Sequence, residues 1–360
     1  MSPRPAGAQR RNTPVLFVTT EIPPDRVGAF RALAARVPVE FALFGGGLHA
    51  TSGVDDHGLH VHHVSQREVY GLAASRRYGA VVAGTVGRTA LPAAWLGAER
   101  ARVPFVLWTA LWAHPRSLAH LPGSLLLRVL YRRSDAVVTY GPHVSALASR
   151  LGARHPVVAP QAVDVDFWTA HQDLGTRASS TPPTLLYVGR DDPGKGVDWL
   201  LRSWQASGLG ERGEAELRLV GPEPPRASGV AGVVATGPLA PVDVRAEMGK
   251  ACAVVVPSEQ TGTFREPWGL VVNEAMHTGT LVIASTQVGA VAGGLAVPGR
   301  TALVTPAGDV NGLSTALLTA AAPQTPELLA IRRNAAQESA AYTHDAWAAT
   351  FASALEGSLA

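Results

Sequence analysis

The chain has 360 residues, of which 46% are hydrophobic and 16% charged, and this length predicts two globular domains, not one. Its net charge of +3, without any long block of like charges, argues against a nucleic-acid partner but leaves room for a basic site that takes small anions. Cys252 is the only cysteine, which excludes an intrachain disulfide and favours a reducing compartment.

The chain opens with a Pro/Arg-rich segment and a short apolar run, Val15-Leu16-Phe17-Val18. This run is too short for the hydrophobic region of a signal peptide, and it is predicted as a first strand. No apolar run approaches the roughly 18 residues of a membrane span. These observations predict a cytoplasmic protein.

Short apolar runs alternate with helical segments through both halves of the chain, which is typical of parallel sheets covered by helices. The first half has predicted helices at 28–36 and 125–134 and seven predicted strands, at 15–19, 39–44, 61–64, 80–83, 105–108, 136–140 and 157–159. In the second half the strands are predicted at 185–188, 217–220, 233–236, 253–256 and 281–284.

A polar, Pro/Ser-rich stretch at 173–184 separates the two patterns and is predicted as a linker. The first domain is then 1–172 and the second 185–340. Both are predicted to be α/β and doubly wound, with ligands at the carboxyl ends of the strands and in the cleft between the domains.

The first candidate site is Tyr-Val-Gly-Arg-Asp-Asp-Pro-Gly-Lys-Gly, residues 187–196. Gly189 and Arg190 follow a predicted strand, and Lys195 stands between two glycines ahead of a predicted helix. Two cations near a helix N-terminus suit a phosphate, and glycines let a loop approach a ligand. The alternative is a solvated turn with two surface cations, since neither a Walker loop nor a dinucleotide fingerprint is present.

The second candidate site is Arg-Glu-Pro-Trp-Gly-Leu-Val-Val-Asn-Glu-Ala-Met, residues 265–276. Pro267 restricts Glu266 to extended backbone and suits the first turn of a helix. Glu274 follows about two turns later, so both carboxylates could face one cleft and hold the hydroxyls of a polyol. The alternative is a helix-terminus charge at Glu266 and an exposed Glu274.

The third candidate is His114, in Trp-Thr-Ala-Leu-Trp-Ala-His-Pro at the end of a predicted strand, and a structural histidine is the alternative. His60, His62 and His63 are predicted to lie on a solvated strand, and no spacing matches a zinc site. The apolar segment 125–133 carries three arginines. This segment is predicted either as an ordinary amphipathic helix or as a helix that contacts an anionic membrane surface.

Taken in order, these segments resemble the retaining glycosyltransferases of family 4, a nucleotide-sugar-dependent group with the GT-B fold. Glu266 and Glu274 match the Glu-x7-Glu motif of that family, and the loop from Val188-Gly189-Arg190 to Lys195-Gly196 matches as well. Further matches are Leu219-Val220-Gly221, Ser134-Asp135-Ala136 and Pro306-Ala307-Gly308-Asp309. The resemblance covers nearly the whole chain and is strongest from Leu185 to Pro306.

The resemblance implies two Rossmann-like domains facing an interdomain cleft and a C-terminal helix, within 341–360, that packs back on the first domain. Arg190 and Lys195 would bind the donor diphosphate, and Glu266 would hold the donor sugar. Glu274 would bind the ribose. The donor set would also include Gly189, Trp268, Gly269, Leu270 and Val271.

On the acceptor side, the resemblance maps the first-domain histidine of the family onto His114, and Arg26 is a candidate in the loop after the first strand. That loop, Thr19 to Gly28, lacks the paired glycines of many family members, so its pocket is expected to be shaped by side chains. No metal or cofactor is expected.

The predicted function is therefore a metal-independent, retaining transfer of sugar from a nucleoside-diphosphate-sugar to an acceptor hydroxyl. The pathway would be cell-envelope glycan, glycolipid or natural-product glycoside synthesis, with a small or lipid-linked acceptor and peripheral membrane contact left open. A non-catalytic nucleotide-sugar-binding protein and a nucleotide-sugar epimerase on the same fold are the alternatives. Donor base, sugar, acceptor and oligomeric state stay undetermined.

Overall fold

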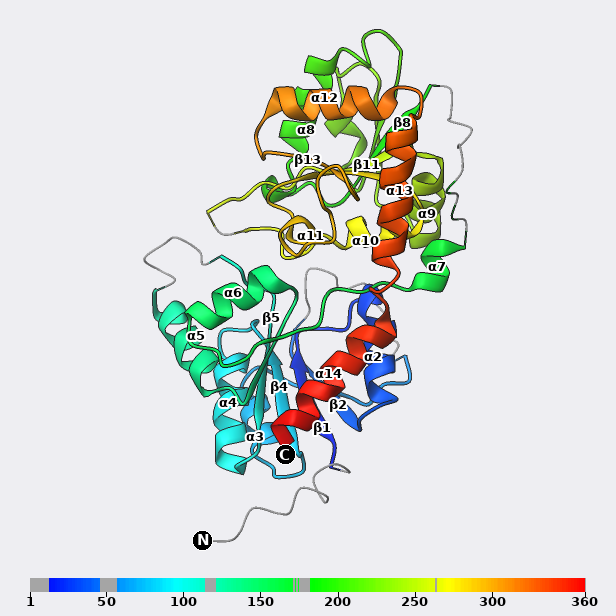
Figure 1. Ribbon diagram of the computed structural model, residues 1–360. Helices are drawn as coiled ribbons and strands as arrows, with labels where there is room; N and C mark the ends of the chain where they lie inside the picture. Colours follow the sequence, from blue (N-terminus) through cyan, green and yellow to red (C-terminus); the bar gives the residue numbers. More distant parts are fainter. Residues whose placement is uncertain are drawn as a thin grey trace. The chain divides into compact units, whose positions relative to one another are not determined.

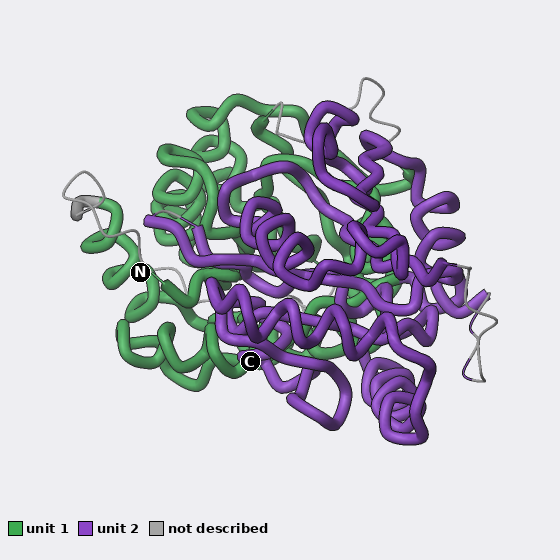
Figure 2. Tube along the Cα trace, turned by 90° about the horizontal axis from the view of Figure 1, so that it is seen from above, with its two compact units in different colours: residues 1–163, 343–360 green, residues 164–342 purple. Residues whose placement is uncertain are grey.

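The computed structural model describes residues 13–45, 57–113, 121–170, 172, 174, 182–262 and 264–359. The chain divides into two compact units, coloured separately in Figure 2. Unit 1 comprises residues 1–163 and 343–360, and unit 2 comprises residues 164–342.

Unit 1 is built on a seven-stranded sheet in which all strands are parallel, in the order β3-β2-β1-β4-β5-β6-β7. The strands are β1 (Val15–Thr19), β2 (Val39–Leu43), β3 (Val61–His63), β4 (Ala80–Gly84), β5 (Phe105–Thr109), β6 (Ala136–Thr139) and β7 (Val157–Val158). The order 3-2-1-4-5-6 is that of a doubly wound Rossmann sheet, here with one strand added.

Helices cover both faces of this sheet because alternate residues of a strand point to opposite sides. Val15 and Phe17 of β1 belong to one buried cluster, while Leu16 and Val18 belong to another. The helices of unit 1 are α2 (Pro24–Ala34), α3 (Glu68–Ala73), α4 (Ala90–Ala101), α5 (Leu121–Arg133), α6 (Pro142–Arg150) and α14 (His344–Leu359).

The last helix, α14, lies beside α2 on one face of the unit 1 sheet (Figure 1). Its Phe351 ring lies 5.6 Å from that of Phe17, and Trp347 lies 5.9 Å from Phe30. A side chain at Gly28 would meet the His344 ring at 2.2 Å, so this glycine permits the close approach of the two helices. Residues distant in the sequence thus complete one core.

Unit 2 repeats the same architecture with a six-stranded parallel sheet in the order β10-β9-β8-β11-β12-β13. The strands are β8 (Thr184–Val188), β9 (Glu216–Val220), β10 (Val233–Gly237), β11 (Ala253–Val256), β12 (Leu281–Ser285) and β13 (Leu303–Thr305). The α-helices are α7 (Val165–Thr169), α8 (Val197–Ser207), α9 (Pro241–Lys250), α10 (Leu270–His277), α11 (Gly289–Ala292), α12 (Val310–Ala321) and α13 (Pro326–Ser339). Two short 3₁₀ turns are η2 (Pro193–Lys195) and η3 (Pro224–Ala227).

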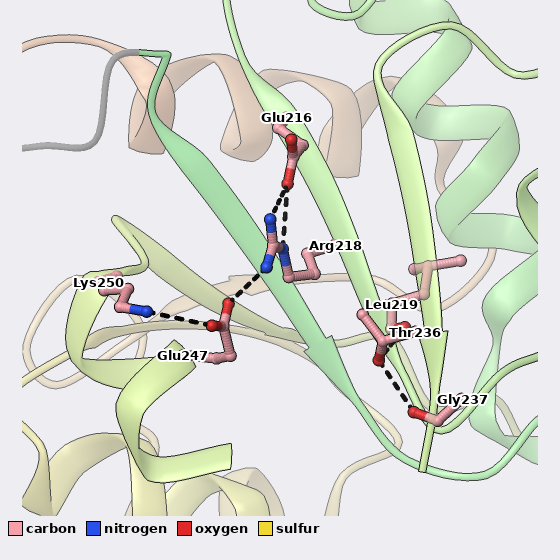
Figure 3. Close-up of polar contacts among 7 residues, drawn as sticks. All are labelled: Glu216, Arg218, Leu219, Thr236, Gly237, Glu247 and Lys250. Atoms are coloured by element: carbon pink, nitrogen blue, oxygen red, sulfur yellow. Dashed lines mark hydrogen bonds and ion pairs between the residues drawn. The ribbon is translucent and has the colours of Figure 1, made fainter. Parts of the chain in front are cut away.

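A network of charged residues joins β9 to α9 in unit 2 (Figure 3). Arg218 donates to Glu216 at 2.8 Å and to Glu247 at 3.0 Å, and Lys250 approaches Glu247 at 3.3 Å. These side chains lie near the start of the strand, away from its carboxyl end. The network therefore braces the sheet and leaves the expected ligand edge free for other residues.

The predicted strands are confirmed to within one residue at each end, but β13 was missed because three residues are too few to show a pattern. The predicted helix 28–36 begins earlier, at Pro24, so Arg26, which was predicted to lie in the loop before it, belongs to α2. The division between the units also precedes the predicted boundary at 172, since Arg245 of α9 donates to the Phe167 carbonyl in α7. Of the predicted linker, only residues 174 and 182–184 are described, and Thr184 already belongs to β8.

Candidate functional site

Each sheet has a switch point, where the first strand lies between neighbours whose connections run in opposite directions. In unit 1, β1 lies between β2 and β4, and in unit 2, β8 lies between β9 and β11. Ligands of doubly wound sheets bind outside the carboxyl ends of the strands at this point. Lys195 follows β8, and Glu266 follows β11, so the predicted donor residues gather at the switch point of unit 2.

The two glycines around Lys195 allow the loops after β8 and β11 to interlock. A side chain at Gly196, whose φ is +74°, would lie 1.9 Å from the Pro257 carbonyl oxygen. One at Gly194 would lie 2.2 Å from the Phe264 ring, and the Glu259 N–H donates to the Gly194 carbonyl at 2.9 Å. The sequence suggested that these glycines approach a ligand, whereas the structure has them approach the neighbouring loop.

This interlocking brings Lys195 and Glu266 together. Lys195 Nζ lies 2.6 Å from Glu266 Oε2, and the Ser258 hydroxyl donates to the same oxygen at 3.1 Å. The ammonium also lies 5.5 Å from the centre of the Phe264 ring. Glu266 is only 6% exposed, so the cost of burying its carboxylate must be offset by these two hydrogen-bond donors. The Ser285 hydroxyl in turn donates to the Ser258 carbonyl and fixes this loop.

Arg190 lies at the same strand end but is turned to solvent. Its side chain is 49% exposed, and its guanidinium pairs with Asp192 at 3.1 Å, a contact that is easily exchanged for a ligand. Its carbonyl accepts a hydrogen bond of 2.7 Å from the Tyr187 hydroxyl, and burial raises the pKa of Tyr187, so the phenol stays a donor. The Gly189 N–H donates to the Val220 carbonyl at 3.0 Å. The loop is thus fixed at its backbone while the arginine side chain is accessible.

Helix α10 begins three residues later than the proline suggested. It starts at Leu270, after Gly269 with a φ of +87°, so Pro267 lies in the preceding loop together with Glu266. The prediction that Glu266 lies in the loop before the helix is confirmed, while Glu274 is half-buried within α10. The first N–H groups of α10, at Leu270 and Val271, have no acceptor within the helix, and such a helix end favours an anion.

The side chain of Trp268 lies in the interior of unit 2. It is 2% exposed, its Nε1 donates to Asn273 Oδ1 at 2.7 Å, and its ring lies 5.8 Å from that of Tyr342. A side chain at Gly293 would meet this ring at 2.5 Å. The Trp268 side chain therefore packs in the core of unit 2, and its contact with a donor stays a prediction.

The predicted acceptor residues belong to unit 1. Arg26 lies in the first turn of α2 and lines a pocket at the switch point of this sheet, together with Trp108 and Tyr140. His114 falls outside the described residues, so its role stays a prediction. His62, predicted on a solvated strand, is half-buried on β3 and lies 2.8 Å from Glu40.

Within the described ranges, no group of three or more His, Cys, Asp and Glu is placed to hold a metal ion. In the same part of the chain, no helix combines the length and the hydropathy needed to cross a bilayer.

Comparisons with known proteins extend this description. Residues 182–322 match the family model described as Glycosyl transferases group 1. No curated protein matches the sequence. Among solved structures, Anabaena Alr3699/HepE in complex with UDP and glucose shares 20% identity and a TM-score of 0.73, over 95% of this chain and 98% of that chain. The chain has the GT-B fold.

Two further structures agree in fold. Sucrose-phosphate synthase from Thermosynechococcus elongatus has 18% identity and a TM-score of 0.71, over 94% of this chain and 97% of that chain. A glycosyltransferase from Rickettsia africae has 14% identity and a TM-score of 0.75, over 97% and 99%. The segment that matches the family model contains the switch point of unit 2, with Lys195, Glu266 and Glu274.

Sequence reasoning did not assign roles to Ser258 and Phe264, which complete the surroundings of Lys195 and Glu266. Ser258 follows β11 by two positions, and that placement at a strand end was the only available signal. Nothing in the sequence indicated that the Phe264 ring faces Lys195, because this contact depends on how two loops fold against each other.

Proposed function

We propose that the chain is a retaining, metal-independent glycosyltransferase that moves a sugar from a nucleoside-diphosphate-sugar to an acceptor hydroxyl. The observation that carries the proposal is the cluster of Lys195, Glu266 and Ser258 at the switch point of unit 2. It lies within the segment that matches the group 1 glycosyl transferases, and UDP and UDP-glucose are bound in the Anabaena HepE structures.

In this proposal the diphosphate of the donor binds at the loop after β8. Lys195 and Arg190 neutralise the negative charge that grows on the leaving phosphate, and the N-terminal end of α10 adds its backbone N–H groups. Glu266 accepts hydrogen bonds from hydroxyls of the donor sugar, and Glu274 accepts them from the ribose. Because Lys195 already contacts Glu266, one residue pair links the phosphate to the sugar.

The transfer itself needs no nucleophile from the protein. The bond from the anomeric carbon to the phosphate oxygen breaks, and the acceptor oxygen forms its bond on the same face. Because the new bond forms on the face that the phosphate leaves, the configuration at the anomeric carbon is retained. The acceptor proton passes to the departing phosphate oxygen, which neutralises the charge that develops there. Arg26 and His114 are assigned to the acceptor. Cell-envelope glycan, glycolipid or natural-product glycoside synthesis is the proposed setting.

The test is ligand-dependent thermal stability with a panel of nucleoside diphosphates and nucleotide-sugars, followed by product analysis with donor and candidate acceptors. A ligand at about 100 times its Kd stabilises the fold by roughly 2.7 kcal/mol. Lys195→Ala should abolish the shift. Lys250→Ala is the matched control, because Lys250 is the other lysine of the chain and pairs with Glu247 away from the switch point.

The results separate the proposal from its alternatives. A shift lost only in Lys195→Ala, together with sugar transfer, supports the proposal. Binding without transfer or donor hydrolysis favours a non-catalytic nucleotide-sugar-binding protein, and conversion of the donor sugar alone favours an epimerase. No shift with any nucleotide contradicts the proposal.

A further inference from the structure

The pocket of unit 1 is a small cavity at the carboxyl ends of its central strands. It has a volume of about 240 Å³ and is lined by Thr19 and Thr20 after β1, Gly84 and Thr85 after β4, and Trp108 of β5, among others. Pockets for drug-sized ligands span roughly 300–1,000 Å³. A cavity of this size suits a compact polar group.

A buried arginine lines this cavity. Arg26 is 7% exposed, and its guanidinium carbon lies 5.9 Å from the centre of the Trp108 ring and 5.6 Å from that of Tyr140. Its Nε pairs with Asp25 at 3.4 Å, while its buried Nη1 has no hydrogen-bond partner among the residues that the structure describes. Two aromatic rings hold the side chain in position, and one nitrogen of the guanidinium lacks an acceptor among the described residues.

An unsatisfied buried donor on a charged group is costly, and in native structures such a group calls for an explanation. Core packing does not provide one, because a neutral apolar side chain would fill the same space between the rings at lower cost. The planar guanidinium instead suits bidentate binding of a carboxylate or phosphate. Arg26 thus has the properties of a ligand-binding group, since the described residues supply no acceptor for its Nη1.

The surroundings of the cavity favour an anion, although the carboxylates of Asp25 and Glu21 oppose it. The N-terminal end of α2 lies here, with Pro23 and Arg26 lining the cavity, and the positive end of a helix attracts negative charge. Thr19 and Thr20 can add hydroxyl donors. Burial raises the pKa of Tyr140, so its phenol is neutral. Glu21 also lines the cavity and opposes an anion, but it is half-exposed and can turn to solvent.

The unit that contains this cavity is basic, whereas the other unit is acidic. Unit 1 carries 18 arginines against 10 aspartates and glutamates, whereas unit 2 carries 13 basic against 18 acidic residues. The small net charge of the whole chain conceals this difference. A basic unit attracts anionic ligands to its surface.

We propose that the unit 1 cavity binds an anionic group of the acceptor, a phosphate or a carboxylate, through Arg26. The inference rests on the proposed function, which places the acceptor in this unit, and it names the chemical class of that acceptor. The charged group anchors the substrate, and the hydroxyl that receives the sugar belongs to the same molecule.

The experiment is isothermal titration of the full chain with glucose 6-phosphate, glucuronate, inorganic phosphate and neutral glucose. At least one anionic probe should bind roughly 10-fold or more tightly than glucose, as expected for one charge-assisted contact. The preference should disappear in Arg26→Gln, recover partly in Arg26→Lys and persist in Arg31→Gln. Arg31 lies on the same helix, is exposed and does not line the cavity.

Each result has a defined meaning. Preference for the two phosphates identifies a phosphorylated acceptor, and preference for glucuronate identifies an acidic sugar. Equal binding of charged and neutral probes by the wild-type chain, or no binding of any anion, overturns the inference, as does a preference that survives in Arg26→Gln. Titration of the same samples with UDP tests the donor site separately. If the chain binds UDP but none of the anionic probes, the proposed function stands and only this inference fails. If the chain binds no nucleoside diphosphate of any base, the result counts against the proposed function.

Discussion

The pair of Lys195 and Glu266 predicts that two substitutions at one contact have different effects on nucleotide binding. Lys195→Met removes the cation and keeps the length of the side chain, while Glu266→Gln removes the anion and keeps its shape. In the free chain Lys195 Nζ lies 2.6 Å from Glu266 Oε2, so each charged group holds the other in place. We expect the first substitution to weaken binding of a nucleoside diphosphate and the second to leave it unchanged or tighten it.

The magnitudes follow from burial. Breaking a fully buried pair costs about 3–5 kcal/mol, but Lys195 is partly exposed and Ser258 still donates to Glu266, so Lys195→Met should lower the free energy of unfolding by about 2 kcal/mol. Glu266→Gln should cost about 1 kcal/mol, because the freed ammonium can reach water. Loss of one charge-assisted contact to phosphate should raise the Kd of the diphosphate by roughly 10- to 100-fold in Lys195→Met.

The assay combines urea unfolding of the free chain with titration of a nucleoside diphosphate, UDP first, into both variants and their double mutant. In Glu266→Gln the sugar contact is lost, so a nucleotide-sugar should gain nothing over the corresponding diphosphate. If Glu266→Gln weakens the diphosphate as much as Lys195→Met does, then Glu266 does not act on the sugar, and the assignment of the two residues to different parts of the donor is wrong.

Other predictions concern stability and surface contact. Gly196→Ala should destabilise the chain by more than about 2 kcal/mol, because it forces both a positive φ and a clash with a carbonyl, while Gly213→Ala, at a φ of +65° in open space, should cost about 1 kcal/mol in urea unfolding. Burial lowers the pKa of His277 to about 4, so below pH 6.5 the unfolded chain binds a proton that the folded chain does not bind. The free energy of unfolding should therefore fall by about 3 kcal/mol between pH 6.5 and 4. His277→Gln should make this dependence on pH less steep, whereas His60→Gln, at an exposed position, should not change it. Leu125 of α5 is 64% exposed beside arginines, and Leu125→Asp should lower sedimentation with anionic vesicles if α5 contacts a membrane; equal sedimentation would contradict this contact.

Much of the fold could be predicted because parallel strands buried on both faces leave continuous apolar runs. The strand ends after Val188 and Val256 were visible in this way, and they fix where Lys195 and Glu266 lie relative to the sheet. The division of the chain was less accessible. It depends on α7 packing with the second unit through Arg245, which no local pattern reveals.

Within the site, residue types were easier to predict than their surroundings. Lys195 and Glu266 were marked by their neighbours in the sequence, but the start of α10 was misplaced because Pro267 suits both a loop and a first helical turn. The burial of Trp268, whose indole donates to Asn273 five positions later, was not visible in the sequence. The burial of Arg26 between two rings also arises from tertiary packing alone.

The place of α14 in unit 1 has a consequence for the folding of the chain during its synthesis. The core around Phe17 and Phe30 is completed by Trp347 and Phe351, which leave the ribosome only after all of unit 2 has been synthesised. At translation speeds of about 5–20 residues per second, the apolar face that α14 covers stays open for on the order of ten seconds or more. Unit 2 can therefore fold first although it comes second in the chain, and the nascent first unit is the part that a chaperone would have reason to hold.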